Sequence, residues 1–390
     1  MARKLTLPIA FLLLVTSMMG TGVIMLPKGF ADVGYISGSV LLIILSLASF
    51  FTLYAMCYCA DLVQTVPVTY YSTCKNINKY IAYMADISIA FHGFGCSVAY
   101  LMAMRNWISE LFNVGNKYSV VLYLFFPLLL ISIRNDLGSL QYVSYLSLIS
   151  VFYLGFILIY LYFTVNNDDK TIKPFNSNIG SGLPILIFAL GCHQNIITVF
   201  SNLKNKSLGR MTIVALLSTI CGTTFYLAIG LFGYLLIGDT IKGPILDYLR
   251  NFNISILLVN ISIGGFIFVM ICAFPMHLHP ARKAIIELFY EISKHEETEQ
   301  NHNRLSKSLT VIFTIGCTGL ALIPGLDITG VIGIVGSTAS NMIIYGFPSL
   351  IYLISAKNFK FLTVIACFIF ISSILLMIFM LFNQLVSEKM

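Results

Sequence analysis

Two clusters of small and polar residues interrupt long apolar runs of this chain. The first reads Met19-Gly20-Thr21-Gly22-Val23 and lies in the middle of the apolar run 5–34. The second lies in the apolar run 181–203 and reads Leu190-Gly191-Cys192-His193, two residues after Phe188. Glycine has the conformational freedom that unwound backbone needs, so we predict a break in the helix at each cluster.

A broken helix at membrane depth can bind a solute through its backbone. Lipid cannot hydrogen-bond to a free N–H or C=O group, so unwound backbone is tolerated there only where it lines a cavity in the protein. The half-helix after Gly22 offers N–H groups to a carboxylate, and the ends of the preceding half-helices offer carbonyl oxygens to an ammonium group or a cation. An amino acid carries both groups.

The two clusters together predict an amino-acid site, although a tight helix contact is the alternative meaning of the glycine pair. Phe188 is the best candidate for a gate because it directly precedes the second break. The residues that we expect to bind the substrate are Met19, Gly20, Thr21, Gly22, Val23, Phe188, Leu190, Gly191, Cys192 and His193.

Several titratable residues lie in apolar segments, where they could carry proton, metal or enzyme chemistry. His193 could hydrogen-bond the substrate or take a coupling proton, and the alternative is a histidine that caps the helix. His277 and His279 point in different directions on one helix, so we expect no metal site. Asp86 is expected to be solvated near the end of its helix. No nucleophile with a matching histidine and carboxylate is found, so we expect neither an enzyme nor a cofactor.

The composition places these clusters in a membrane protein. Of 390 residues, 58% are hydrophobic and only 10% are charged, and the mean hydropathy is +0.90. The net charge of +7 comes from Lys and Arg in separate short loops rather than in one patch, which argues against a nucleic-acid partner. Eight of the nine cysteines fall inside apolar segments, and the ninth, Cys74, lies in a predicted cytoplasmic loop. We therefore expect no disulfide in an outer loop.

Apolar runs long enough to cross about 30 Å of hydrocarbon recur along the chain. We predict an all-α integral membrane protein with about eleven transmembrane helices, embedded in the bilayer as a single domain and as a monomer. The predicted spans are residues 5–34, 36–63, 79–112, 117–135, 139–165, 181–203, 208–237, 252–292, 306–325, 328–355 and 360–386.

The two broken helices also predict an internal repeat. They are the first and the sixth helix, which occupy corresponding positions in two five-helix halves of opposite orientation. The first repeat is expected at about 5–165, the second at about 181–355 and an extra helix at about 360–386. Most of the 23 Lys and Arg residues fall on the side of the N-terminus, which predicts a cytoplasmic N-terminus.

Several strings of the sequence resemble the amino acid/auxin permease family. Gly-Thr-Gly-Val-Ile-Met-Leu-Pro at 20–27 resembles the motif of its first helix, and Phe-Ala-Leu-Gly-Cys-His-Gln-Asn at 188–195 is similar to its sixth helix. Phe-Pro-Met-His-Leu-His-Pro-Ala-Arg at 274–282 is similar to the end of its eighth helix, and Val-Ala-Tyr-Leu at 98–101 to part of its third.

The resemblance implies a LeuT-type fold, with two inverted five-helix halves and an eleventh helix, that moves amino acids by alternating access. The Cys-His-Gln-Asn string at 192–195 is most similar to fungal vacuolar exporters and to sodium-coupled neutral amino acid transporters. The implied location is therefore either a vacuolar or lysosomal membrane or the plasma membrane.

The resemblance also bears on the coupling ion. In the sodium-dependent members a hydroxyl residue on the eighth helix completes a sodium site, and the alignment puts Ala273 at that position. Proton-coupled or sodium-independent transport is therefore favoured. The alternatives are a sodium-coupled amino acid symporter and a sensor or receptor of the same fold that does not transport. Arg105 departs from the family pattern in the third helix.

Overall fold

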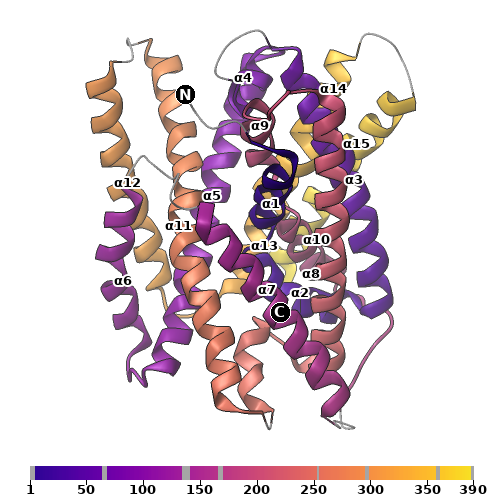
Figure 1. The fold of residues 1–390 in the computed structure, drawn as a ribbon, viewed down its shortest axis with the longest axis vertical. Helices are drawn as coiled ribbons and strands as arrows, with labels where there is room; N and C mark the ends of the chain where they lie inside the picture. The colour runs from indigo at the N-terminus through magenta and orange to yellow at the C-terminus, as the bar shows by residue number, and fades with distance from the viewer. Residues whose placement is uncertain are drawn as a thin grey trace.

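The structure, a computed structural model, is a bundle of helices (Figure 1). It describes residues 5–63, 68–133, 141–165, 170–252, 254–294, 298–356 and 361–387. The longest helices run roughly along one common direction, and their connections lie at the two ends of the bundle (Figure 1). These long helices are α3 (Tyr35–Asp61), α5 (Lys79–Leu111), α7 (Gln141–Thr164), α10 (Leu208–Ile237), α11 (Ile256–Ser293), α12 (Glu299–Ala321) and α15 (Phe361–Ser387).

Both predicted helix breaks are present. Helices α1 (Leu7–Met18) and α2 (Thr21–Val33) are separated by two residues and bent by 53°. Helices α8 (Ile179–Ala189) and α9 (His193–Ser201) are separated by three residues. Regular helical hydrogen bonding does not continue through either break. Each break lies at one of the glycine-containing clusters, because glycine tolerates the unwound backbone.

The segment predicted as the tenth helix is irregular in its middle. It consists of α13 (Ile328–Val335), the π-helical stretches η4 (Gly336–Ser340) and η5 (Met342–Gly346), and α14 (Phe347–Ser355). A Cβ on Gly336 would lie 2.2 Å from the carbonyl oxygen of Pro184, so only glycine lets this segment approach α8 so closely. The side chain of Asn341 donates to the carbonyl of Ser373 on α15 at 2.7 Å and holds the irregular segment against that helix.

The number of membrane spans depends on two helices. Among the described residues, eight helices are long and apolar enough to cross a membrane, and the bent pair α1–α2 raises this to nine. Helix α6 (Lys117–Ser132) has only 16 residues, and α12 begins with a polar stretch. Each predicted span contains a helix. Because α6 is short and α12 is partly polar, the count of eleven membrane spans stays a prediction. The division into two repeats also stays a prediction.

The two ends of the bundle carry different short elements. The N-terminal face, which is the upper end in Figure 1, carries α4 (Tyr70–Lys75) and α9. The opposite face carries the short 3-10 helices η2 (Gly238–Thr240) and η3 (Ile245–Asn251), which follow α10. The most extensive pairing in the bundle joins α5 to α11, and these two helices form one wall of the candidate site.

Candidate binding site

A single tyrosine connects the two helix breaks. Tyr226 lies on α10 and is fully buried. Its hydroxyl is 2.7 Å from the carbonyl oxygen of Met18 and 2.8 Å from that of Ala189, the last residues of α1 and α8. Carbonyls at the end of a helix have no partner within the helix. The single hydroxyl proton of Tyr226 is shared between these two carbonyls and links the two broken ends.

The two glycines of the first break have different neighbours. A Cβ on Gly22 would lie 2.6 Å from the Cα of Ala189, so Gly22 lets α2 pack directly against the end of α8. A Cβ on Gly20 would instead lie 2.9 Å from the Tyr100 hydroxyl, across a cavity. Gly22 therefore fits the helix-contact alternative, whereas Gly20 lines the cavity opposite Tyr100.

A small cavity of about 40 Å³ lies beside the first break. Polar side chains from α1, α5 and α9 meet there with the apolar and histidine side chains of α11. Thr21, in the first turn of α2 next to the cavity-lining Gly20, has a buried hydroxyl without a hydrogen-bond partner. The cavity is lined by Thr16, Ser17, Met19, Gly20, Tyr100, Ser147, Gln194, Asn195, Val269, Ala273, Met276 and His277.

Of the ten predicted binding residues, Met19 and Gly20 line this cavity. Phe188 packs its ring 5.7 Å from that of His92. Thr21, Gly22, Val23, Leu190 and Cys192 are buried and Gly191 is half-buried, and none of these six lines the cavity in this conformation. The binding roles of these residues stay predictions.

His193 is engaged away from the cavity. The side chain is fully buried, and its Nε2 atom lies 2.9 Å from the Thr52 hydroxyl on α3. It lines neither the small cavity nor the wider vestibule on the N-terminal face. The side chain also makes no capping hydrogen bond for α9. His193 therefore joins α9 to α3, which neither alternative from the sequence foresaw.

A wider vestibule of about 350 Å³ adjoins the small cavity on the side of the N-terminal face. Its walls come from α4, α5, α9 and α11, and it shares Gln194, Asn195 and Met276 with the small cavity. A third pocket of about 380 Å³, on the opposite face, shares no lining residue with the small cavity. The small cavity thus adjoins the vestibule and not the third pocket in this conformation.

Asp86 in the vestibule wall differs from its sequence prediction. We expected a solvated carboxylate, but the residue is only 2% exposed and its Oδ2 atom has no hydrogen-bond partner. The packing of α5 against α4 and α11 covers it. The charged neighbours that line the same vestibule are Lys283 and Glu287, which form an i,i+4 pair at 3.7 Å. A carboxyl inside a membrane-spanning helix is a functional candidate.

Arg105, which departs from the family pattern, lines the pocket on the opposite face. Its guanidinium donates to the carbonyl of Ala321 and lies 5.0 Å from the centroid of the Tyr118 ring. Nearby, Asp247 on η3 accepts a hydrogen bond of 2.6 Å from the indole nitrogen of Trp107. Burial raises the pKa of Asp247 to about 6. Arg105 and Asp247 thus connect α5 to α12 and to η3.

Comparison with known proteins identifies the family. Residues 3–386 match the sequence model of the family described as transmembrane amino acid transporter protein. The chain belongs to this family. The resemblance inferred from the strings at 20–27 and 188–195 is thereby confirmed, and the family consists of transporters rather than enzymes.

Two relatives agree with this assignment. The chain is 26% identical over 357 residues to vacuolar amino acid transporter 5 of Schizosaccharomyces pombe, covering 88% of this chain and 83% of that protein. It is 24% identical over 375 residues to sodium-coupled neutral amino acid transporter 7 of Danio rerio, covering 89% and 78%.

The solved structure is that of a Na⁺-coupled sialic acid symporter in a substrate-bound outward-open state. It superposes with a TM-score of 0.64 at 12% identity and covers 95% of this chain and 89% of that one. The predicted LeuT-type fold is confirmed. The chain is a multi-pass membrane protein of an amino acid transporter family.

Proposed function

We propose that this protein is a secondary active transporter that moves amino acids by alternating access and binds them at the small cavity. The observation that carries this proposal is the position of the cavity. It lies beside the first helix break, includes the start of α9 after the second break, and is reached through the vestibule.

The groups around the cavity suit an amino-acid backbone. The first turn of α2 follows the cavity-lining Gly20. Its N–H groups and the unpartnered Thr21 hydroxyl would suit a carboxylate once the half-helices move. Gln194 and Asn195 present side-chain amides from the opposite side, and their carbonyl oxygens suit an ammonium group. The substrate side chain would then extend toward the apolar residues of α11, such as Val269 and Met276.

The size of the cavity implies motion during transport. About 40 Å³ is the room of roughly one water molecule, which is less than any amino acid needs. Substrate entry therefore requires the half-helices to move away from α5 and α11. The vestibule widens this path on the N-terminal face, and closing it while opening the opposite face would complete alternating access.

The lining of the cavity favours transport that does not depend on sodium. Ala273, the position at which the sodium-dependent members carry a hydroxyl, lines the cavity with a methyl group, and a methyl group cannot coordinate a hard cation. We assign the coupling proton to Asp86, because a carboxyl lining the substrate path can change its charge during the cycle.

We place the protein in a vacuolar or lysosomal type of membrane, in line with its vacuolar relative. The charge bias of the sequence orients the N-terminus toward the cytoplasm. In that orientation the vestibule opens to the cytoplasm, and the third pocket faces the lumen.

Substitution of Gly20 tests the location of the binding site. Gly20→Val places a branched side chain against the Tyr100 hydroxyl and into the cavity. We expect uptake of labelled amino acids into proteoliposomes to fall at least tenfold. The control is Gly319→Val on α12, where an added Cβ meets nothing within 4 Å. Equal uptake by the two variants would contradict the assignment of the cavity.

A further inference from the structure

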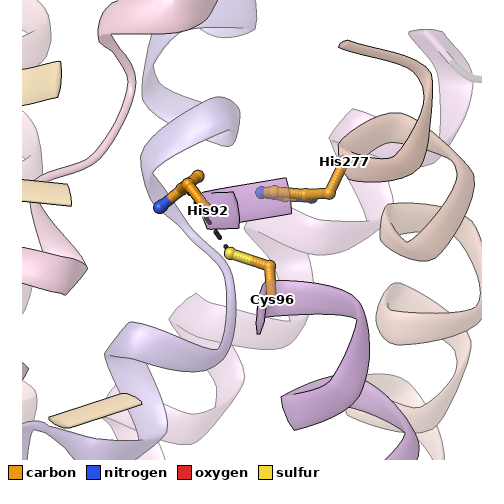
Figure 2. Close-up of side chains that lie close together, drawn as sticks. All are labelled: His92, Cys96 and His277. Atoms are coloured by element: carbon orange, nitrogen blue, oxygen red, sulfur yellow. Dashed lines mark hydrogen bonds between the residues drawn. The ribbon is translucent and has the colours of Figure 1, made fainter. Parts of the chain in front are cut away.

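Three side chains with metal-ligand chemistry converge behind the wall of the small cavity. His92 and Cys96 lie one turn apart on α5, and His277 approaches them from α11 (Figure 2). One ligand atom from each residue lies within 4.8 Å of the other two. Among the described residues, this is the one group of three histidine, cysteine or acidic side chains with such spacing.

The His277 ring is oriented as a metal ligand would be. Its Nδ1 atom lies 3.1 Å from the carbonyl oxygen of Ala273. The Tyr100 hydroxyl lies 3.4 Å from the same Nδ1 atom. In the tautomer that donates to the Ala273 carbonyl, Nδ1 carries the proton and Nε2 keeps a lone pair. A backbone carbonyl that fixes the tautomer in this way is the usual outer partner of a metal-binding histidine.

The His92 ring has a comparable outer partner. Its Nδ1 atom lies 3.0 Å from the Ser340 hydroxyl on η4. In the tautomer that donates to Ser340, Nε2 has a lone pair and lies 3.5 Å from the Cys96 sulfur. Both imidazoles can therefore present Nε2 to the space shared with the thiol.

The distances suit a tetrahedral ion. Bond lengths of about 2.0–2.1 Å to nitrogen and about 2.3 Å to sulfur put tetrahedral ligand atoms about 3.3–3.7 Å apart. The His92–Cys96 separation of 3.5 Å already matches. The longest separation, within 4.8 Å, is about 1 Å too wide, which a small rotation of the side chains can close.

We propose that His92, Cys96 and His277 form a binding site for a zinc-class ion in the wall of the substrate cavity. Two imidazoles and a thiolate suit Zn²⁺ and similar borderline ions, whereas Na⁺, Mg²⁺ and Ca²⁺ require oxygen ligands. The sequence argument against metal binding compared His277 only with its neighbour on the same helix. The partners of His277 lie on α5.

An ion can reach this site from the N-terminal face. His277 lines the small cavity, and the cavity shares Met276 and the start of α9 with the vestibule. The fourth coordination position is then the one reached from the cavity, as in metal sites with three protein ligands. Metal binding at these residues does not rest on the proposed transport activity.

The test is a cobalt titration of the purified full-length protein in detergent. Co²⁺ replaces Zn²⁺ in such sites and gives a near-ultraviolet charge-transfer band when a thiolate binds it. We expect one equivalent of Co²⁺ to produce this band and Zn²⁺ to abolish it by displacement. Absence of the band in the unmodified protein would overturn the proposal.

Variants locate the site. Cys96→Ser should abolish the band, and His277→Gln should weaken Co²⁺ binding at least tenfold. His277 is only half-buried, so His277→Gln remains informative if the Cys96 variant fails to fold. The matched control is Cys317→Ser, which removes another buried thiol, on α12, and should leave the titration unchanged. An unchanged titration in His277→Gln, or loss of the band in Cys317→Ser, would overturn the assignment.

Discussion

The hydroxyl of Tyr226 lies 2.7 Å from the carbonyl oxygen of Met18, at the point where the first half-helix ends. The same hydroxyl lies 2.8 Å from the carbonyl of Ala189, where the other half-helix ends. One buried group thus sets the separation of the two breaks. Any motion that separates the end of α1 from the end of α8 has to break at least one of the two contacts.

Removing this hydroxyl should destabilise the protein. Tyr226→Phe keeps the ring but removes the one donor that the buried carbonyls of Met18 and Ala189 share, so we expect a loss of about 1–3 kcal/mol in the free energy of unfolding. The matched control is Tyr153→Phe on α7, whose hydroxyl also donates to a carbonyl but at an exposed position, and which should cost less than about 0.5 kcal/mol. Denaturant unfolding in detergent measures both, and equal effects would show that Tyr226 is no special link.

Asp86 should be needed for proton coupling. In Asp86→Asn the vestibule keeps its shape but loses the carboxyl, so we expect uptake to stop responding to an imposed proton gradient while exchange of internal for external amino acid continues. Asp61→Asn is the control, because Asp61 is exposed and pairs with Lys206 at the surface. A full response to the proton gradient in the Asp86 variant would remove this residue from the coupling step.

Trp107 should report the protonation of Asp247. Burial raises the pKa of Asp247 to about 6 from 3.8, and Trp107, its hydrogen-bond partner, is the only tryptophan of the chain. We expect a change in tryptophan fluorescence with a midpoint near pH 6, and no such change in Asp247→Asn. A midpoint near pH 4 in the unmodified protein would show that Asp247 titrates like a solvated carboxyl.

The raised pKa of Asp247 also makes the stability of the protein depend on pH. A carboxyl whose pKa is higher in the folded protein binds its proton more tightly there, so its favourable contribution is complete below about pH 4 and is lost as the pH rises through 6. We expect the free energy of unfolding to decrease less between pH 4 and pH 7 in Asp247→Asn than in the unmodified protein.

Zinc should inhibit transport through the cluster behind the cavity. An ion held by Cys96 and His277 lies in the cavity wall, so micromolar Zn²⁺ should lower amino acid uptake at least several-fold. Cys96→Ser should transport without this inhibition, and Cys317→Ser should remain sensitive. Equal inhibition of all three proteins would place the inhibitory zinc elsewhere.

Much of the fold was predictable because it depends on local patterns. Apolar runs of membrane length located the helices, and the strings around Gly20 and Gly191 located both breaks, since lipid leaves unwound backbone few places to lie. The family followed from the same strings. The number of true spans was harder to predict, because α6 is short and the start of α12 is polar.

The site was only partly predictable because its contacts join distant helices. Nothing in the spacing of His193 reveals that Thr52 on α3 is its partner. The role of Gly22 also depends on a neighbour, Ala189, that the sequence does not place next to it. The sequence places Asp86 near the end of its helix, which suggested a solvated carboxylate. Its burial depends on the packing of α4 and α11, which the sequence does not show. Such relationships require the tertiary structure.

Transport itself is tested most directly by uptake into proteoliposomes that contain the purified protein. A panel of labelled amino acids is offered while proton and sodium gradients are imposed separately. We predict saturable uptake of at least one amino acid that a proton gradient drives and a sodium gradient does not. Binding of amino acids without any flux under either gradient would contradict the account and indicate a sensor, and uptake driven only by sodium would contradict the interpretation of Ala273.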